Sequence, residues 1–74
     1  MSLLDSKTGG TYTVLRIELE RDVSRRLQAL GLTQGTRVSV LNRKKSGSVI
    51  IYVRGTRFAV GKQIAEGILV KGSE

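Results

Sequence analysis

The sequence predicts a mainly β fold, a small barrel of about five strands with one short α-helix after the first strand and a helical turn before the last. Three observations indicate this class. Short segments rich in β-branched and aromatic residues recur along the 74-residue chain. Turn residues separate them at intervals of about eight to twelve residues, as in small barrels and sandwiches. Helical spacing of apolar residues is confined to residues 22–30. No internal repeat or linker divides the chain, so we expect one domain over residues 1–74.

The first strand is expected over residues 11–19, where β-branched and aromatic residues dominate. Side chains of a strand alternate between its two faces. Tyr12 and Val14 therefore share one face, whereas Leu15 and Ile17 share the other. This pattern predicts either a bulge near Leu15 or burial of both faces.

A short helix is expected over residues 22–30. Asp22 is placed to cap its first turn, because its carboxylate accepts hydrogen bonds from backbone N–H groups that have no helical partner. Val23, Leu27 and Leu30 recur at the spacing of one narrow apolar stripe. A helix this short is marginal alone, so we expect it to dock on the sheet.

The helix is expected to end at Gly31, in a left-handed conformation that residues with a β-carbon avoid. With Gly31 in this position, Leu27 and Leu32 form the hydrophobic pair of a Schellman motif. Gly35 then supplies a second turn before the next strand.

Four further strands and one helical turn account for the rest of the chain. Arg54 and Gly55 are expected to form a tight hairpin turn. Closure of the strands into an SH3-like barrel removes exposed sheet edges. The strands are expected over residues 36–42, 48–53, 56–60 and 68–70, with a polar loop over 42–48 and a helical turn over 61–66.

The distribution of charge predicts an anionic partner. The net charge is +7, and neither Asp nor Glu occurs between Val23 and Ala65. Such a basic stretch favours nucleic acid, an acidic protein surface or anionic lipid headgroups, unless the charge serves solubility alone. Its bases are Arg25, Arg26, Arg37, Arg43, Lys44, Lys45, Arg54, Arg57 and Lys62.

The composition gives catalysis little basis. The chain contains no histidine and no cysteine, so its serines lack an imidazole base and it has no thiol nucleophile. Residues 55–62 partly match a phosphate-binding loop, but five residues separate the glycines instead of four, and Gln63 follows the lysine where Ser or Thr would hold magnesium. We expect no enzymatic activity.

One ordered set of residues runs through nearly the whole chain, from about residue 4 to residue 71. It comprises Gly9, Val14, Arg26, Leu27, Leu30, Gly31, Leu32, Gly35, Val38, Val40, Gly47, Val53, Gly55, Ala59, Val60, Gly61, Lys62, Ala65, Ile68 and Val70. No single member is specific, but the set at these spacings resembles the FeoA family, small cytoplasmic proteins associated with bacterial ferrous iron transport.

The resemblance implies an SH3-like barrel that works beside FeoB, a large membrane transporter whose cytosolic part hydrolyses GTP. We interpret the chain as a non-enzymatic cytoplasmic accessory protein that docks on this transporter and modulates it. Signature residues are assigned a structural role: Arg26, Leu27, Leu30, Gly31, Gly35, Gly55 and Gly61. Contacts with the partner are assigned to Arg43, Lys44, Lys45, Arg54, Arg57 and Tyr52.

An association with iron transport does not require iron to bind this chain. Glu18, Glu20 and Asp22 alternate and offer carboxylate oxygens, but the glycine and distal glutamate of a calcium loop are missing. Selective ferrous iron sites ordinarily use imidazole or thiolate ligands, which the composition lacks. We expect Glu20 and Asp22 to complement the positive end of the helix instead, with no metal site and no cofactor.

Two other interpretations stay open. The basic stretch suits nucleic acid, but single-strand binders usually combine such charge with several stacking aromatics, and this chain has three aromatic residues. Self-association through the two-sided apolar strand at residues 49–53 is the second. No apolar run is long enough to span a bilayer, so we expect no direct membrane insertion and a cytoplasmic location, at the inner face of the membrane through the partner.

Overall fold

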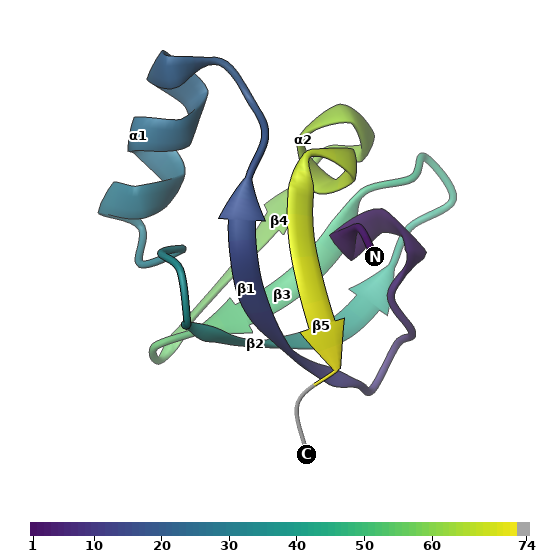
Figure 1. Ribbon diagram of the computed structural model, residues 1–74. Helices are drawn as coiled ribbons and strands as arrows, with labels where there is room; N and C mark the ends of the chain where they lie inside the picture. Colours follow the sequence, from purple (N-terminus) through teal and green to yellow (C-terminus); the bar gives the residue numbers. More distant parts are fainter. Residues whose placement is uncertain (73–74) are drawn as a thin grey trace.

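The computed structural model describes residues 1–72 and contains one antiparallel sheet of five strands that curves into a barrel-like roll (Figure 1). The strand order is β4-β3-β2-β1-β5. This arrangement confirms the predicted mainly β, SH3-like class. The elements are η1 (Leu3–Asp5), β1 (Thr11–Ile17), α1 (Arg21–Ala29), β2 (Arg37–Arg43), β3 (Val49–Val53), β4 (Thr56–Val60), α2 (Lys62–Glu66) and β5 (Ile68–Gly72).

The core consists mainly of aliphatic residues on the inner face of the sheet. Val38 and Val40 of β2 are buried, as are the alternate residues of β3. This alternation follows from the two-residue period of a strand, as the sequence predicted. Each strand lies within a residue or two of its expected bounds, although β5 continues to Gly72 because it pairs with β1 along its whole length.

A bulge interrupts β1 near Leu15, which is one of the two alternatives that the sequence predicted. The pairing of β1 with β5 shifts register between Val14 and Arg16. Leu15 is turned outward and is 38% exposed, whereas Val14 is buried and Ile17 packs against the core. In a regular strand, Val14 and Ile17 would point to opposite faces. The extra residue at the bulge lets both of them face the same core.

Helix α1 begins earlier than predicted and without the predicted cap. Arg21 is its first residue, Glu20 occupies the N-cap position, and no side-chain hydrogen bond caps the helix. Asp22 lies within the first turn instead, where its charge still favours the positive end of the helix. The assignment of Asp22 as the cap was therefore wrong, because the helix starts one residue before it.

The end of α1 confirms the predicted Schellman motif. Gly31 has φ of +100°, and its N–H donates to the Gln28 carbonyl at 3.0 Å. The N–H of Leu32 donates to the Leu27 carbonyl at 2.9 Å. Leu27 and Leu32 are both buried, so this pair anchors the helix to the barrel.

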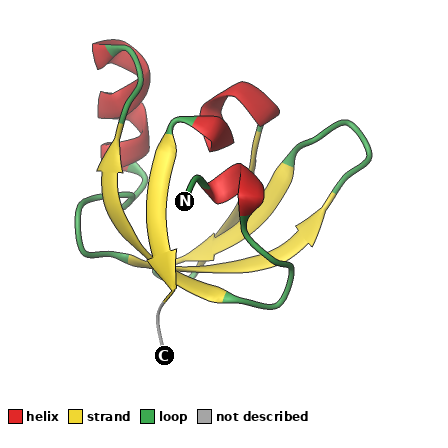
Figure 2. Ribbon diagram, turned by 45° about the vertical axis from the view of Figure 1, so that its right-hand side comes forward, coloured by secondary structure: helices red, strands yellow, loops and turns green. Residues whose placement is uncertain are grey.

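The amino terminus forms an element that the sequence analysis did not predict. The short helix η1 lies beside α2 and covers one end of the barrel (Figure 2). Leu3 is fully buried there, and the N–H of Val70 donates to the Met1 carbonyl at 2.8 Å. The first residues of the chain thus complete the core instead of preceding the fold.

Candidate functional site

The outer face of the β3–β4 hairpin carries part of the predicted contact set. Tyr52 and Arg57 are directly opposed across the two strands, and cross-strand partners project from the same face. Tyr52 is 46% exposed and Arg57 is exposed. These two side chains form a continuous outward-facing patch beside the core.

The turn of this hairpin confirms the predicted tight connection. Arg54 and Gly55 have φ of +49° and +84°, the two positive values that a type I′ turn requires. The side chain of Arg54 runs toward the end of α1, since its Cδ lies 3.0 Å from where a β-carbon on Gly31 would stand. Arg54 therefore connects the hairpin turn with the helix end.

Lys44 and Lys45 lie at the opposite end of the β3–β4 hairpin. They are exposed in the loop between β2 and β3, where the N–H of Gly47 donates to the Lys44 carbonyl at 2.9 Å. The side chain of Lys62 at the start of α2 packs on Gly47. The length of β3 separates this lysine cluster from the Arg54 turn by about 13 Å. The predicted contact residues other than Arg43 thus form two groups, one at each end of β3.

Arg43 is engaged within the protein and does not belong to either group. Its guanidinium donates hydrogen bonds to the backbone carbonyls of Leu4 and Ser6. The side chain is partly buried and holds η1 together with Ser6, the residue that follows it. Arg43 was predicted as a partner contact because it adjoins the lysines in sequence, but the direction of its side chain gives it a structural task.

Most of the signature residues occupy structural positions. Leu27 is in the core, and Gly31, Gly35 and Gly55 all have positive φ at turns. Gly61 precedes α2 as its N-cap residue. Arg26 and Leu30 differ, because both are exposed on α1.

An apolar groove of about 230 Å³ lies between α1 on one side and β4 with α2 on the other. Leu30, which was expected in the buried stripe of the helix, is 51% exposed and forms part of its wall. Leu30 occupies the C-cap position of α1. The lining residues are Val23, Arg26, Leu27, Leu30, Phe58, Ala59, Val60 and Ile64.

The sequence alone did not predict this groove. Leu30 was expected to be buried with Val23 and Leu27, so no local pattern showed that it would face the apolar residues of β4 across a groove. Apolar surface of this kind marks interaction sites when it is contiguous.

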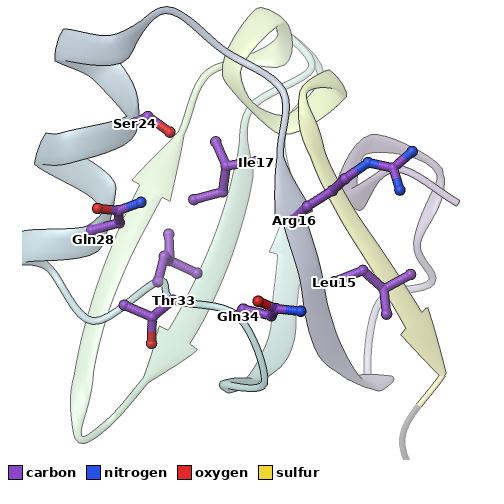
Figure 3. A pocket seen from close by; sticks show the side chains of 8 residues that line it. Leu15, Arg16, Ile17, Ser24, Gln28, Thr33 and Gln34 are labelled. Carbon is purple, nitrogen blue, oxygen red and sulfur yellow. The ribbon is translucent and has the colours of Figure 1, made fainter.

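A second, polar cleft of about 210 Å³ lies on the other side of α1, against β1. Figure 3 shows Ser24 and Gln28 projecting from the helix toward Ile17, while Arg16 extends away from the cleft. The Arg16 guanidinium instead pairs with Glu18, with an Nε–Oε2 distance of 2.9 Å. Apart from Arg16, the lining residues carry hydroxyl, amide and aliphatic groups, and none of them offers Ser24 a histidine or carboxylate base.

Residues 1–72 contain neither a cluster of metal-ligating side chains nor a helix suited to span a bilayer. That part of the chain contains no group of three or more Asp or Glu side chains placed to hold a metal ion. Neither described α-helix has the length and apolar character needed to cross a membrane. Two surface features distinguish this molecule. One is the apolar groove, and the other is the set of exposed bases at the two ends of β3, here called the basic hairpin: Lys44, Lys45, Arg54 and Arg57.

Comparison with known proteins identifies the family. The chain is 30% identical over 69 residues to a protein of Methanocaldococcus jannaschii whose name assigns it provisionally to Fe(2+) transport, as transport protein A. The match covers 93% of this chain and 83% of that protein. The solution structure of the FeoA protein from Chlorobium tepidum superposes on this chain with a TM-score of 0.90, and the two sequences are 32% identical. The match covers 97% of this chain and 70% of that one.

The same fold also occurs within a larger regulator. The structure of a manganese-dependent transcriptional repressor matches this chain with a TM-score of 0.89 and 24% sequence identity. The match covers 99% of this chain and 41% of the repressor. At this identity the likeness concerns the fold alone. The model of the FeoA domain matches residues 1–72, which comprise every residue that the structure describes. The chain therefore belongs to the FeoA domain family, whose members are non-catalytic accessory domains connected with ferrous iron transport.

Proposed function

We propose that this protein is a non-enzymatic cytoplasmic accessory factor that docks on the cytosolic part of a FeoB-type ferrous iron transporter. One observation carries the proposal within the family. Arg54 and Arg57 are exposed beside Tyr52, and Lys44 and Lys45 are exposed at the other end of β3, in a stretch of chain without a single Asp or Glu. An acidic protein surface complements such a patch, and the exposed aromatic ring offers an anchor within it.

The proposed mechanism is a population shift. A domain without catalytic groups changes a transporter only if it binds one conformation more tightly than another. Basic residues accelerate the encounter with an acidic surface, and apolar contacts then prolong the complex. Neither step requires iron or nucleotide to bind this chain.

The test is retention of the protein by the detergent-solubilised transporter. We expect the triple variant Lys44→Glu, Lys45→Glu, Arg57→Glu to lose at least about tenfold in affinity, because like charges then face each other across the interface. The matched control is Lys7→Glu, Arg21→Glu, Lys71→Glu, which has the same net charge but alters exposed bases elsewhere. Equal weakening of both variants would reject the hairpin surface, and no retention of the wild type would reject the transporter as partner.

Binding of nucleic acid is the alternative that the charge favours. Tyr12 is 7% exposed and Phe58 is partly buried, which leaves Tyr52 as the exposed aromatic for stacking within residues 1–72. Proteins that bind single-stranded nucleic acid usually combine basic residues with several exposed aromatic side chains on which the bases stack. A salt-dependent mobility shift of labelled RNA or DNA at physiological ionic strength would promote this alternative over the transporter.

A further inference from the structure

The apolar groove lies along a free edge of the sheet. β4 pairs with β3 alone, so its other edge has no neighbouring strand among residues 1–72. Phe58, Ala59 and Val60 all line the groove although they are consecutive. Successive residues of a strand point to opposite faces, so three in a row line one groove only where it runs along the strand edge.

The register of the hairpin identifies which backbone groups the edge presents. Val53 and Thr56 close the two-residue turn as a hydrogen-bonded pair, and such pairs alternate along an antiparallel ladder. Phe58 and Val60 therefore bond to β3. The N–H and C=O groups of Arg57 and Ala59 point away from β3, toward the open edge. Both residues are exposed.

Helix α1 forms the opposite wall and adds both apolar surface and positive charge. Val23, Leu27 and Leu30 supply the apolar surface, and Arg26 lies among them. Arg54 lies at one end of the groove, against the glycine that follows Leu30. No carboxylate belongs to the lining. The groove thus combines a strand edge, an apolar wall and unneutralised cations.

We propose that this groove binds an extended segment of a partner protein, which adds to β4 as a sixth strand. The free N–H and C=O groups of Arg57 and Ala59 recognise its backbone, as in other cases of β-augmentation. Alternate apolar side chains of the segment enter the groove, and a flanking carboxylate meets Arg26 or Arg54. The inference rests on the proposed function in one respect, since it takes the transporter's cytosolic part as the source of this segment.

A proline substitution tests the strand edge directly. Ala59→Pro removes an N–H that points away from β3, and edge strands tolerate proline where the N–H faces outward. Ala59→Thr is the matched control, because it keeps the N–H and suits a strand. Leu30→Ser tests the helix wall, with Leu41→Ser as its control, since Leu41 is similarly exposed (42% against 51%) but lies outside the groove. Amide NMR spectra of each variant report whether the fold is retained.

The primary probe is the synthetic peptide acetyl-Glu-Asp-Val-Thr-Val-Thr-Val-amide, titrated into the 15N-labelled full chain. We expect amide shifts confined to β4 and α1, and at least tenfold slower hydrogen exchange of the Ala59 amide in the complex. Affinity should fall at least tenfold in Ala59→Pro and Leu30→Ser and stay within twofold in both controls. Replacing the peptide's two acidic residues by Lys and Arg should weaken binding as well. Absence of shifts at millimolar peptide, shifts outside the groove, or equal affinity of Ala59→Pro would overturn the inference.

The transporter's solubilised cytosolic part is the second probe, and it separates the two proposals. Peptide binding in the groove, with no retention of the wild type by that part, rejects the transporter but keeps the groove's chemistry. Equal retention of the wild type and Ala59→Pro keeps the transporter and rejects the groove. A dimer that forms on a sizing column and dissociates in Ala59→Pro assigns the groove to a second copy of this chain, which also overturns the inference.

Discussion

Gly67 leaves no room for a side chain. A β-carbon at this position would stand 2.4 Å from Cδ2 of Leu19 and 2.8 Å from the Glu18 carbonyl oxygen. The backbone itself is relaxed, with φ of −91°. The constraint therefore comes from the close approach of two segments, where the Glu18 N–H donates to the Gly67 carbonyl at 2.7 Å.

Gly67→Ala is expected to lower the free energy of unfolding by about 1–3 kcal/mol, because the added methyl group overpacks this contact. Urea denaturation measures the change. Gly72→Ala is the control, since nothing lies within 4 Å of its β-carbon position, and its effect should stay within about 0.5 kcal/mol. Equal effects of the two substitutions would contradict the steric explanation.

Arg43→Lys separates charge from geometry at the residue that holds the amino-terminal segment. Lysine keeps the positive charge but lacks the planar fork that reaches the carbonyls of Leu4 and Ser6 together. We expect a loss of about 1–2 kcal/mol in the free energy of unfolding. Retention by the transporter should be unchanged, because Arg43 is not part of the proposed surface. Lys45→Arg, at an exposed position nearby, is the control for stability.

At the scale of elements, α1 is the least embedded part of the described chain. It lies between the polar cleft on one side and the apolar groove on the other, and Leu27 is its one buried residue. The Schellman pair of Leu27 and Leu32 therefore provides much of its attachment. A helix held at its end in this way leaves Val23 and Leu30 on the wall of the apolar groove.

Leu27→Ala and Leu30→Ala compare the two leucines of this helix. We expect Leu27→Ala to cost about 2–4 kcal/mol of unfolding free energy, because truncation leaves a cavity in the core. Leu30→Ala should cost less than about 1 kcal/mol, since its side chain is half exposed. Thermal denaturation followed by circular dichroism provides the comparison. A cost for Leu30→Ala equal to that of Leu27→Ala would place Leu30 in the core.

The whole molecule is a cation whose charge is unevenly distributed. Its net charge is +7, and the acid-free stretch includes β2, β3 and β4. At 0.1 M salt, exposed charges act over about 10 Å, which exceeds the size of one side chain. The basic hairpin therefore influences the approach of a partner before contact is made.

We expect the association rate constant with the transporter's cytosolic part to fall at least about tenfold between 20 and 300 mM NaCl. The dissociation rate should change much less, because short-range apolar contacts determine it. Stopped-flow fluorescence or surface plasmon resonance measures both rates. A salt-independent association rate would contradict electrostatic steering by the hairpin.

Local patterns determined much of this fold. The strand alternation, the bulge at Leu15, the Schellman motif at Gly31 and the Arg54-Gly55 turn all depend on residues within about seven positions of one another. Their geometry follows from steric limits and from hydrogen bonds between near neighbours. These features could be predicted because no distant part of the chain decides them.

Only the folded structure shows which residues far apart in the sequence come into contact. Arg43 meets carbonyls that lie 37 and 39 positions earlier in the chain, and no local pattern indicates such a partner. The groove likewise joins Leu30 to Phe58 and Ile64, which come together only when the sheet curves past α1. The five strands, both α-helices, the charge and the absence of imidazole and thiol groups could all be read from the residues, whereas η1 could not. Packing alone decided which bases are free and which apolar side chains line the groove, because burial depends on the whole chain.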